Sequence, residues 1–233
     1  PGARGKWMQG KICLITGANS GIGRETALAL AKEGAGVVMI CRNPQKGNEA
    51  RRRIQEESGN ENIRLFIADL GSLADLKRVA DEIGEFYSQI DVLLNNAGVS
   101  LPRRHLSPDG HEMMFAVNHL GYYALTCRLI DRVQASPAGR IINVASLAHR
   151  MGVLDFDNLQ GERRFWAFRQ YCNTKLANIL FTRQLALRLE GTGITANCVH
   201  PGVVGTGFAQ DEDGWFASLM KLGKGFLLTP KQG

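Results

Sequence analysis

Short apolar runs rich in β-branched residues alternate along the chain with longer amphipathic stretches. The short runs predict strands at 12–16, 37–41, 63–68, 92–95, 140–144 and 194–199. The longer stretches predict helices at 21–32, 44–57, from residue 72 onwards, at 110–133 and at 168–190. Helix-start residues support two of these boundaries: Pro44 opens one helix, and Ser72 is followed three residues later by Asp75.

Strands that are apolar throughout are typical of strands buried on both faces. Their alternation with helices predicts right-handed βαβ units. We therefore expect an α/β protein with a single-domain Rossmann fold, a doubly wound parallel β-sheet with helices on both faces. Ligands of such sheets bind beyond the carboxyl ends of the strands. Unusual residues stand at those ends: Gly17, Arg42, Asp69, Asn95, Ser146 and Pro201.

The turn between the first strand and the first helix is rich in glycine. Glycine lets the backbone approach a pyrophosphate that rests on the N-terminus of the following helix. The spacing is G-x-x-x-G-x-G and differs from the G-x-G-x-x-G dinucleotide fingerprint. An ordinary helix-start turn is the alternative. The turn predicts a dinucleotide site formed by Gly17, Asn19, Ser20, Gly21, Ile22 and Gly23.

The end of the second strand indicates which dinucleotide binds. An Asp or Glu at this position would hold the ribose hydroxyls of NAD, but the chain has Arg42, followed by Asn43. A cation there suits a 2′-phosphate, so NADP (NADPH) is the expected cofactor. The alternative for Arg42 is an ordinary solvated side chain.

Tyr171 and Lys175 lie four residues apart in a predicted helix and therefore share one face. A nearby ammonium favours the phenolate and lowers the pKa of a tyrosine. Such a pair is suited to exchange a proton with an alcohol or carbonyl oxygen. Ser146, after the fifth strand, would hydrogen-bond the same oxygen. Asn118 stands in predicted helix, where Asn is a poor helix former without a further reason.

Taken together, these motifs resemble the short-chain dehydrogenase/reductase superfamily along nearly the whole chain. The resemblance implies that Tyr171 is the acid-base and that Lys175 lowers its pKa and binds the nicotinamide ribose. It implies that Ser146 orients the carbonyl and that Asn118 carries a proton-relay water. The cofactor-binding residues it implies beyond the glycine turn are Asn43, Asp69, Leu70, Asn95, Ala97, Gly98, Tyr171, Lys175, Pro201, Gly202, Val204 and Thr206.

Within that superfamily the chain is similar to the retinol dehydrogenase-like and protochlorophyllide reductase-like branch. Ser146 and Tyr171 stand 25 positions apart, so the segment 149–169 looks inserted. Apolar residues in this segment and after residue 206 indicate a hydrophobic pocket, and a hydrophobic cluster that packs a lid is the alternative. They are Phe165, Trp166, Phe168, Phe208, Trp215, Phe216 and Met220.

The expected function is an NADP(H)-dependent oxidoreductase that interconverts a hydrophobic alcohol and its aldehyde or ketone. Two alternatives stay open: a reductase of a conjugated C=C bond, and a non-catalytic NADP(H)-binding regulator. The resemblance also implies that relatives continue into a further helix and a last strand, which residues 1–233 are expected to lack. A homodimer is expected through the Tyr171 helix and the helix before it.

Composition removes several other classes of protein. The chain is 44% hydrophobic and 21% charged, which excludes intrinsic disorder for most of it. Its five cysteines are widely spread and form no C-x-x-C pair, so we expect a reducing, cytoplasmic location and no metal site. No apolar run approaches the ~20 residues of a membrane span, although peripheral membrane association stays open. The net charge of +6 indicates a basic surface or a phosphate-rich ligand, and nucleic acid is disfavoured because no binding motif is present.

Overall fold

Six parallel strands form one sheet in the order β3-β2-β1-β4-β5-β6. The structure is a computed structural model that describes residues 6–202, and the strands are β1 (Ile12–Thr16), β2 (Gly36–Cys41), β3 (Ile63–Ile67), β4 (Val92–Asn95), β5 (Arg140–Val144) and β6 (Thr195–Val199). The chain builds β1, β2 and β3 in one direction and then crosses back to place β4 beside β1. The switch point of the sheet therefore lies between β1 and β4, at the end of the glycine turn.

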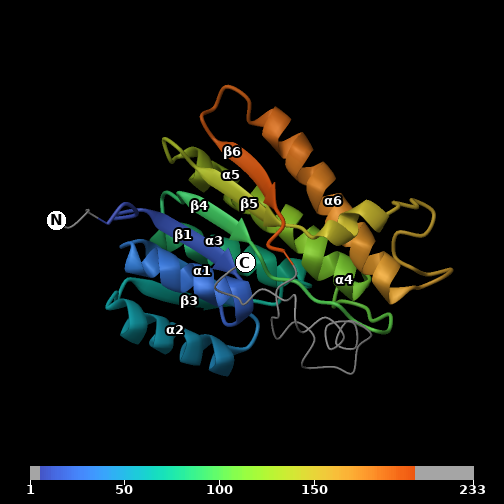
Figure 1. Ribbon diagram of the computed structural model, residues 1–233, viewed down its shortest axis with the longest axis horizontal. Coiled ribbons are helices and arrows are strands. Elements are labelled where there is room, and N and C mark those ends of the chain that lie inside the picture. Colours follow the sequence, from blue (N-terminus) through green and yellow to red (C-terminus); the bar gives the residue numbers. More distant parts are fainter. Residues whose placement is uncertain (1–5, 203–233) are drawn as a thin grey trace.

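Helices cover both faces of this sheet, as Figure 1 shows. They are α1 (Gly21–Lys32), α2 (Pro44–Ser58), α3 (Leu73–Phe86), α4 (Met113–Phe115), α5 (Gly121–Gln134) and α6 (Ala167–Arg188). A five-residue π-helix, η1 (Ala116–Leu120), joins α4 to α5, and a 3₁₀ helix, η2 (Leu147–Met151), follows β5. The predicted doubly wound α/β fold is thus confirmed.

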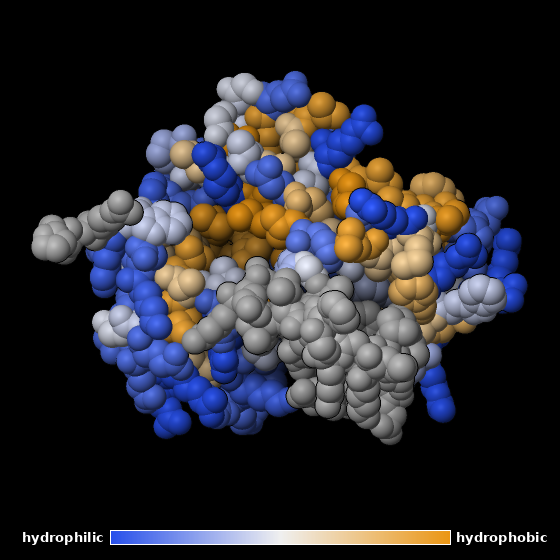
Figure 2. All heavy atoms as spheres, in the orientation of Figure 1, coloured by the Kyte–Doolittle hydropathy of each residue, from blue (hydrophilic) through white to orange (hydrophobic). Residues whose placement is uncertain are grey.

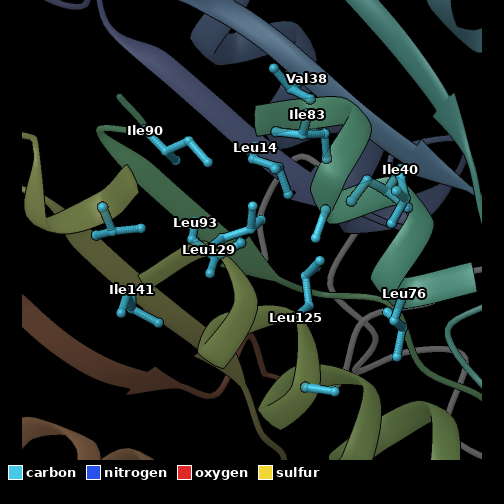
Figure 3. Packing of buried hydrophobic residues seen from close by; sticks show 14 of the residues in the cluster. Leu14, Val38, Ile40, Leu76, Ile83, Ile90, Leu93, Leu125, Leu129 and Ile141 are labelled. Atoms are coloured by element: carbon cyan, nitrogen blue, oxygen red, sulfur yellow. The ribbon is translucent and has the colours of Figure 1, made fainter. Parts of the chain in front are cut away.

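The alternation of side chains along β1 divides the core into two layers. Leu14 points to the layer beneath α3 and α5, where it packs with Leu76, Leu93 and Leu125 (Figure 3). Cys13 and Ile15 point to the opposite layer, which also contains residues of α1 and α2. A strand that is apolar at every position is therefore required at the centre of the sheet.

The edge strands depart from the sequence prediction, which expected every strand to be buried on both faces. Alternate residues of β6 are exposed, and Arg64 of β3 is also exposed. Both strands have a partner on one side only among the described residues. The sequence of a strand shows which residues are apolar. The position of the strand in the sheet determines how far its side chains are buried.

The helix-start signals are confirmed in detail. Asn43 accepts a hydrogen bond from the backbone N–H of Lys46 at the start of α2, at 2.9 Å. Ser72 accepts one from the N–H of Asp75 at 3.2 Å. The Asp75 carboxylate accepts from the N–H of Asp69. The Asp75 side chain therefore joins the first turn of α3 to the loop that follows β3.

Candidate active site

The glycine turn is tied to the end of β4 by one buried side chain, Thr16. Its hydroxyl accepts hydrogen bonds from the backbone N–H groups of Asn96 and Ala97, at 2.9 and 3.0 Å. The Asn96 amide in turn donates to the carbonyl of Thr16, at 2.9 Å. The last residue of β1 thus fixes the chain that leaves β4, and the switch point is held by polar contacts.

Two glycines of this turn lie so close to other atoms that a side chain at either position would displace its neighbours. Gly17 has a φ of +68°, and a Cβ there would lie 2.9 Å from the Cα of Ala97. A Cβ on Gly23 would lie 2.5 Å from the amide nitrogen of Asn96 and from the carbonyl oxygen of Gly17. The turn is compact, and it lets the chain pass directly from β1 into α1.

The N-terminus of α1 keeps hydrogen-bonding capacity. Ser20 is the N-cap residue, but its side chain makes no capping hydrogen bond, and the first turn holds no acidic residue. The first N–H groups of a helix have no partner within the helix. This arrangement fits a pyrophosphate at the turn, since the unpaired N–H groups and the helix dipole both favour an anion.

The next four predicted cofactor residues differ in exposure and in hydrogen bonding. Arg42 is exposed at the carboxyl end of β2. Asn43 uses its side chain to cap α2, and Asp69 accepts from the N–H of Gly71 at 2.9 Å. Leu70 lies in the hydrophobic core. Among these four residues, Arg42 is the exposed cation, and its guanidinium is available at this edge of the sheet.

Asn95 is completely buried, so its side chain lies away from any surface. Its amide donates to Asn143 at 2.8 Å and to Thr126 at 3.0 Å, and Asn143 donates to Thr182 at 2.9 Å. The Asn95 side-chain oxygen has no hydrogen-bond partner among the described residues. This buried chain of amides and hydroxyls links β4, β5, α5 and α6 behind the site.

Tyr122 connects the cofactor end of the site to the predicted catalytic pair. Its hydroxyl donates to the carbonyl of Ala97 at 2.8 Å. The Lys175 ammonium lies 5.9 Å from the centre of the Tyr122 ring and 5.6 Å from the centre of the Tyr171 ring. The glycine turn, the end of β4 and the start of α6 are therefore brought together.

Tyr171 is only 7% exposed, and burial raises the pKa of its phenol to about 12. A hydrogen bond with Ser146 lowers this pKa in part. The sequence predicted a lowered pKa from Lys175, and that direction is wrong for the protein alone. The helical spacing of Tyr171 and Lys175 predicts that a cation lies near the phenol. It does not predict that the Tyr171 ring is buried.

Lys175 is 3% exposed and donates a hydrogen bond to the carbonyl of Val144 at 3.1 Å. Burial lowers the pKa of this ammonium to about 8, whereas the neighbouring Cys198 acts to raise it. Near neutral pH the group thus holds its proton weakly. Any negative charge placed beside it would strengthen that hold.

Asn118 lies in the π-helix, where its side chain makes three contacts. Its side-chain oxygen accepts from the N–H of Val99 at 2.7 Å, and its amide donates to the carbonyl of Val99 and to the hydroxyl of Thr174. The backbone carbonyl of Asn118 accepts from the amide of Asn178 at 2.8 Å. A π-turn displaces backbone groups from the regular α-helical pattern, and such turns are frequent at functional sites.

Several supporting residues were given no role in the prediction from sequence. They are Thr16, Asn96, Tyr122, Thr174 and Asn178. The partners described above lie 25 to 81 positions away along the chain, so no local pattern could identify these contacts. Asn178 stands one helical turn after Lys175, and that spacing was the only available signal.

The last predicted cofactor residues begin where β6 ends. Gly202 has a φ of +83°, a conformation that favours glycine. Val204 and Thr206, together with Phe208, Trp215, Phe216 and Met220, lie outside the described residues. Within residues 6–202, no three His, Cys, Asp or Glu side chains are grouped so that they could hold a metal ion. None of the helices in that range has the length and apolar character of a membrane span.

A parallel sheet in this order, with a glycine turn at its switch point, defines a dinucleotide-binding α/β protein. The buried Tyr171 and Lys175 lie close together, with the Lys175 ammonium 5.6 Å from the centre of the Tyr171 ring. Residues 11–215 match the short chain dehydrogenase family, and the chain belongs to this family of oxidoreductases.

Among curated proteins, the chain is similar to two retinol dehydrogenases of Homo sapiens. It is 42% identical to retinol dehydrogenase 11 over 230 residues, which cover 97% of this chain and 71% of that protein. It is 43% identical to retinol dehydrogenase 13 over 198 residues, which cover 84% of this chain and 60% of that protein. The chain therefore matches less than two thirds of the length of the second relative.

A solved short chain dehydrogenase from Shigella flexneri, complexed with NADP, has the same fold. It superposes with a TM-score of 0.76 at 26% identity, over 98% of this chain and 89% of that one.

Proposed function

We propose that the chain is an NADP(H)-dependent oxidoreductase that interconverts a hydrophobic alcohol and its aldehyde or ketone. The observation that carries the proposal is the buried Tyr171 phenol, which is hydrogen-bonded with Ser146 and has Lys175 on the same helix face. The likeness to retinol dehydrogenases supports the substrate class.

The residues at the switch point fit a dinucleotide. The tight Gly17–Gly23 turn and the uncapped start of α1 suit the pyrophosphate, and the exposed Arg42 suits a 2′-phosphate. An NADP complex of a protein with this fold supports the same choice. When bound, NADPH would supply the hydride to the carbonyl carbon.

This chain's own residues would manage the proton. With its pKa near 12, the Tyr171 phenol is protonated at neutral pH and can donate to the carbonyl oxygen as the hydride arrives. Ser146 would hydrogen-bond and orient the same oxygen. The phenolate left behind would be stabilised by the Lys175 ammonium until it takes a proton from water. The protonated resting state supports reduction as the direction.

Apolar side chains near Ser146 support a hydrophobic substrate. Leu147 follows Ser146 directly and Met151 lies five residues after Ser146, and their exposed fractions are 46% and 56%. Large apolar side chains that remain uncovered beside a catalytic group are typical of a substrate pocket.

We also propose that two copies pair through α5 and α6. Tyr123, Leu180 and Leu187 on these helices are 44–50% exposed, and Tyr123 packs edge-on against Phe181 at 5.6 Å between ring centres. Light scattering after size exclusion tests this: a dimer that Leu180→Glu and Leu187→Glu convert to a monomer would support it. A monomeric wild type would contradict it.

The central test is turnover of retinal and of a long-chain aliphatic aldehyde, with NADPH and NADH in parallel. Reduction to the alcohol with NADPH is expected. Tyr171→Phe should lower kcat by a factor of about 10² to 10⁴ without weakening NADPH binding, because the ring stays and only the proton donor is lost. Arg42→Ala should reduce the preference for NADPH over NADH.

Other outcomes of the same test would contradict the proposal. A saturated carbonyl product would identify a C=C reductase. Tight NADPH binding without turnover of any carbonyl would indicate a non-catalytic regulator. Full activity in Tyr171→Phe would remove this residue from the chemistry.

A further inference from the structure

The segment between η2 and α6 walls a cavity of about 560 Å³ on the side of α6 opposite Tyr171. Arg169 and Asn173 stand four residues apart in α6 and line it from one face of the helix, and Trp166, the residue before the helix, also lines it. Tyr171 is two positions from both Arg169 and Asn173 and therefore projects to the other face. The cavity is separate from the proposed catalytic site.

Three arginines converge on this cavity: Arg163, Arg164 and Arg169. None of them forms an ion pair with another described residue. The guanidiniums of Arg164 and Arg169 lie 4.2 and 5.9 Å from the centre of the Trp166 ring. Asp155 is the one acidic residue of the lining, so the arginines leave two positive charges in excess.

Hydrogen bonds organise the wall that presents these cations. The side chain of Asn158 accepts from the N–H of Arg163 at 2.9 Å and donates to the carbonyl of Arg164 at 3.0 Å. Asn173 accepts from the N–H of Val153 at 2.9 Å. The turn at residues 158–164 and helix α6 thus form two walls of the cavity. In Figure 2, hydrophilic and hydrophobic atoms lie side by side on this right-hand part of the molecule.

We propose that this cavity is a binding site for a phosphate monoester. A guanidinium matches the geometry of phosphate oxygens and binds them through paired hydrogen bonds. A phosphate monoester carries about two negative charges at neutral pH, which equals the excess positive charge of the lining. The volume exceeds that of a phosphate ion and leaves room for an organic group against Trp166.

The phosphate group can come from a soluble metabolite or from a lipid headgroup. Phe156 is 81% exposed and belongs to the same segment, which suits a lipid, whereas the indole of Trp166 suits a soluble aromatic ester. Both sources share the chemistry that the arginines recognise. The proposal does not depend on the reaction proposed for Tyr171, because the two sites lie on opposite faces of α6.

Calorimetric titration with phenyl phosphate, with and without saturating NADP⁺, tests the site. Binding in both conditions is expected, and Arg164→Gln with Arg169→Gln should weaken it at least about tenfold, since two charged hydrogen-bond donors are lost. Arg183→Gln with Arg188→Gln, at two exposed positions towards the far end of the same helix, is the charge-matched control and should leave the affinity unchanged. Arg164→Lys with Arg169→Lys keeps the charge and should retain part of the binding.

Vesicles of phosphatidylcholine with and without phosphatidic acid separate the two sources. Arginine-dependent retention on phosphatidic acid vesicles would identify the lipid headgroup, and binding of phenyl phosphate without retention would identify a soluble ester. Absence of binding, or equal binding by the Arg164/Arg169 glutamine variant and by the Arg183/Arg188 glutamine control, would overturn the proposal. Loss of binding when NADP⁺ is added would also overturn it, because that result would place the phosphate in the glycine turn.

Discussion

At the scale of single residues, burial governs the two groups that are proposed to handle the proton. It raises the pKa of Tyr171 to about 12 and lowers the pKa of Lys175 to about 8. Both shifts favour the neutral form, because a charge is poorly solvated in the interior. The helix spacing shows that the pair exists. The direction of the Tyr171 shift depends on chain segments far away in the sequence.

Lys175→Met should remove a pH-dependent part of the stability. Below pH 8 the ammonium is charged in both the folded and the unfolded chain, so its burial lowers the free energy of unfolding by up to about 3 kcal/mol. Between pH 8 and 10.5 the folded chain releases this proton first. The unfolded chain then binds more protons, and the free energy of unfolding of the wild type rises with pH in this window.

Urea unfolding of both proteins from pH 7 to 10.5 would measure this difference. The variant should be the more stable protein near pH 7, and its advantage should shrink through the window. The buried thiols of Cys13 and Cys41 titrate in both proteins, so their contributions cancel in the difference. Lys77→Met, at an exposed lysine, should show no such window. A difference that stays constant across this range would contradict the prediction.

At the scale of elements, the sequence predicted the strands, the long helices and their starts, because period and capping are local properties. It did not predict the π-helix, since the Asn118 carbonyl exposed there is satisfied by Asn178, 60 positions further on. The same reason applies to Thr16 and Asn96, whose partners lie across the sheet. The residues of the candidate site were therefore identifiable, but the contacts that support them were not.

Gly17→Ala should destabilise the protein more than Gly59→Ala does. Both glycines have a positive φ, +68° and +66°, so both variants bear the same backbone strain of about 1–2 kcal/mol. A Cβ on Gly59 meets nothing within 4 Å, but one on Gly17 would lie 2.9 Å from the Cα of Ala97. The additional crowding should remove about 1–3 kcal/mol more and distort the turn.

Urea unfolding compares the two variants, and titration with NADPH should show weaker binding for Gly17→Ala alone. Equal losses of stability in the two variants would show that the loop after β4 moves aside freely. The packing of the turn against Ala97 would then be unimportant.

At the scale of the whole molecule, the sheet order brings the chain near residue 20 beside the chain near residue 97, although about a third of the sequence separates them. A ligand at the switch point must contact both. NADPH should therefore protect both segments together, and at a hundred times its Kd it should add about 2.7 kcal/mol to the free energy of unfolding.

Hydrogen exchange measured by mass spectrometry, with and without NADPH, tests this pattern. Slower exchange is expected in peptides that cover 17–23 and 96–99. Peptides of α2 that contain Gly59, remote from the switch point, serve as an internal control. Protection confined to the segment 152–166 would place the nucleotide in the arginine-lined cavity and contradict the assignment.

The stretch between Ser146 and Tyr171, which includes the exposed Leu147 and Met151, can vary without moving the two proposed catalytic groups. Ser146 is held at the end of β5 and Tyr171 within α6, and both anchors lie outside that segment. The chain between them is free to change in length and composition while the proton donor and its partner stay in register. Grafting the corresponding segment of a relative should therefore change the range of accepted substrates and leave the proposed acid-base chemistry intact. New substrate specificities could then evolve by replacement of this segment alone, while the proposed catalytic residues stay the same.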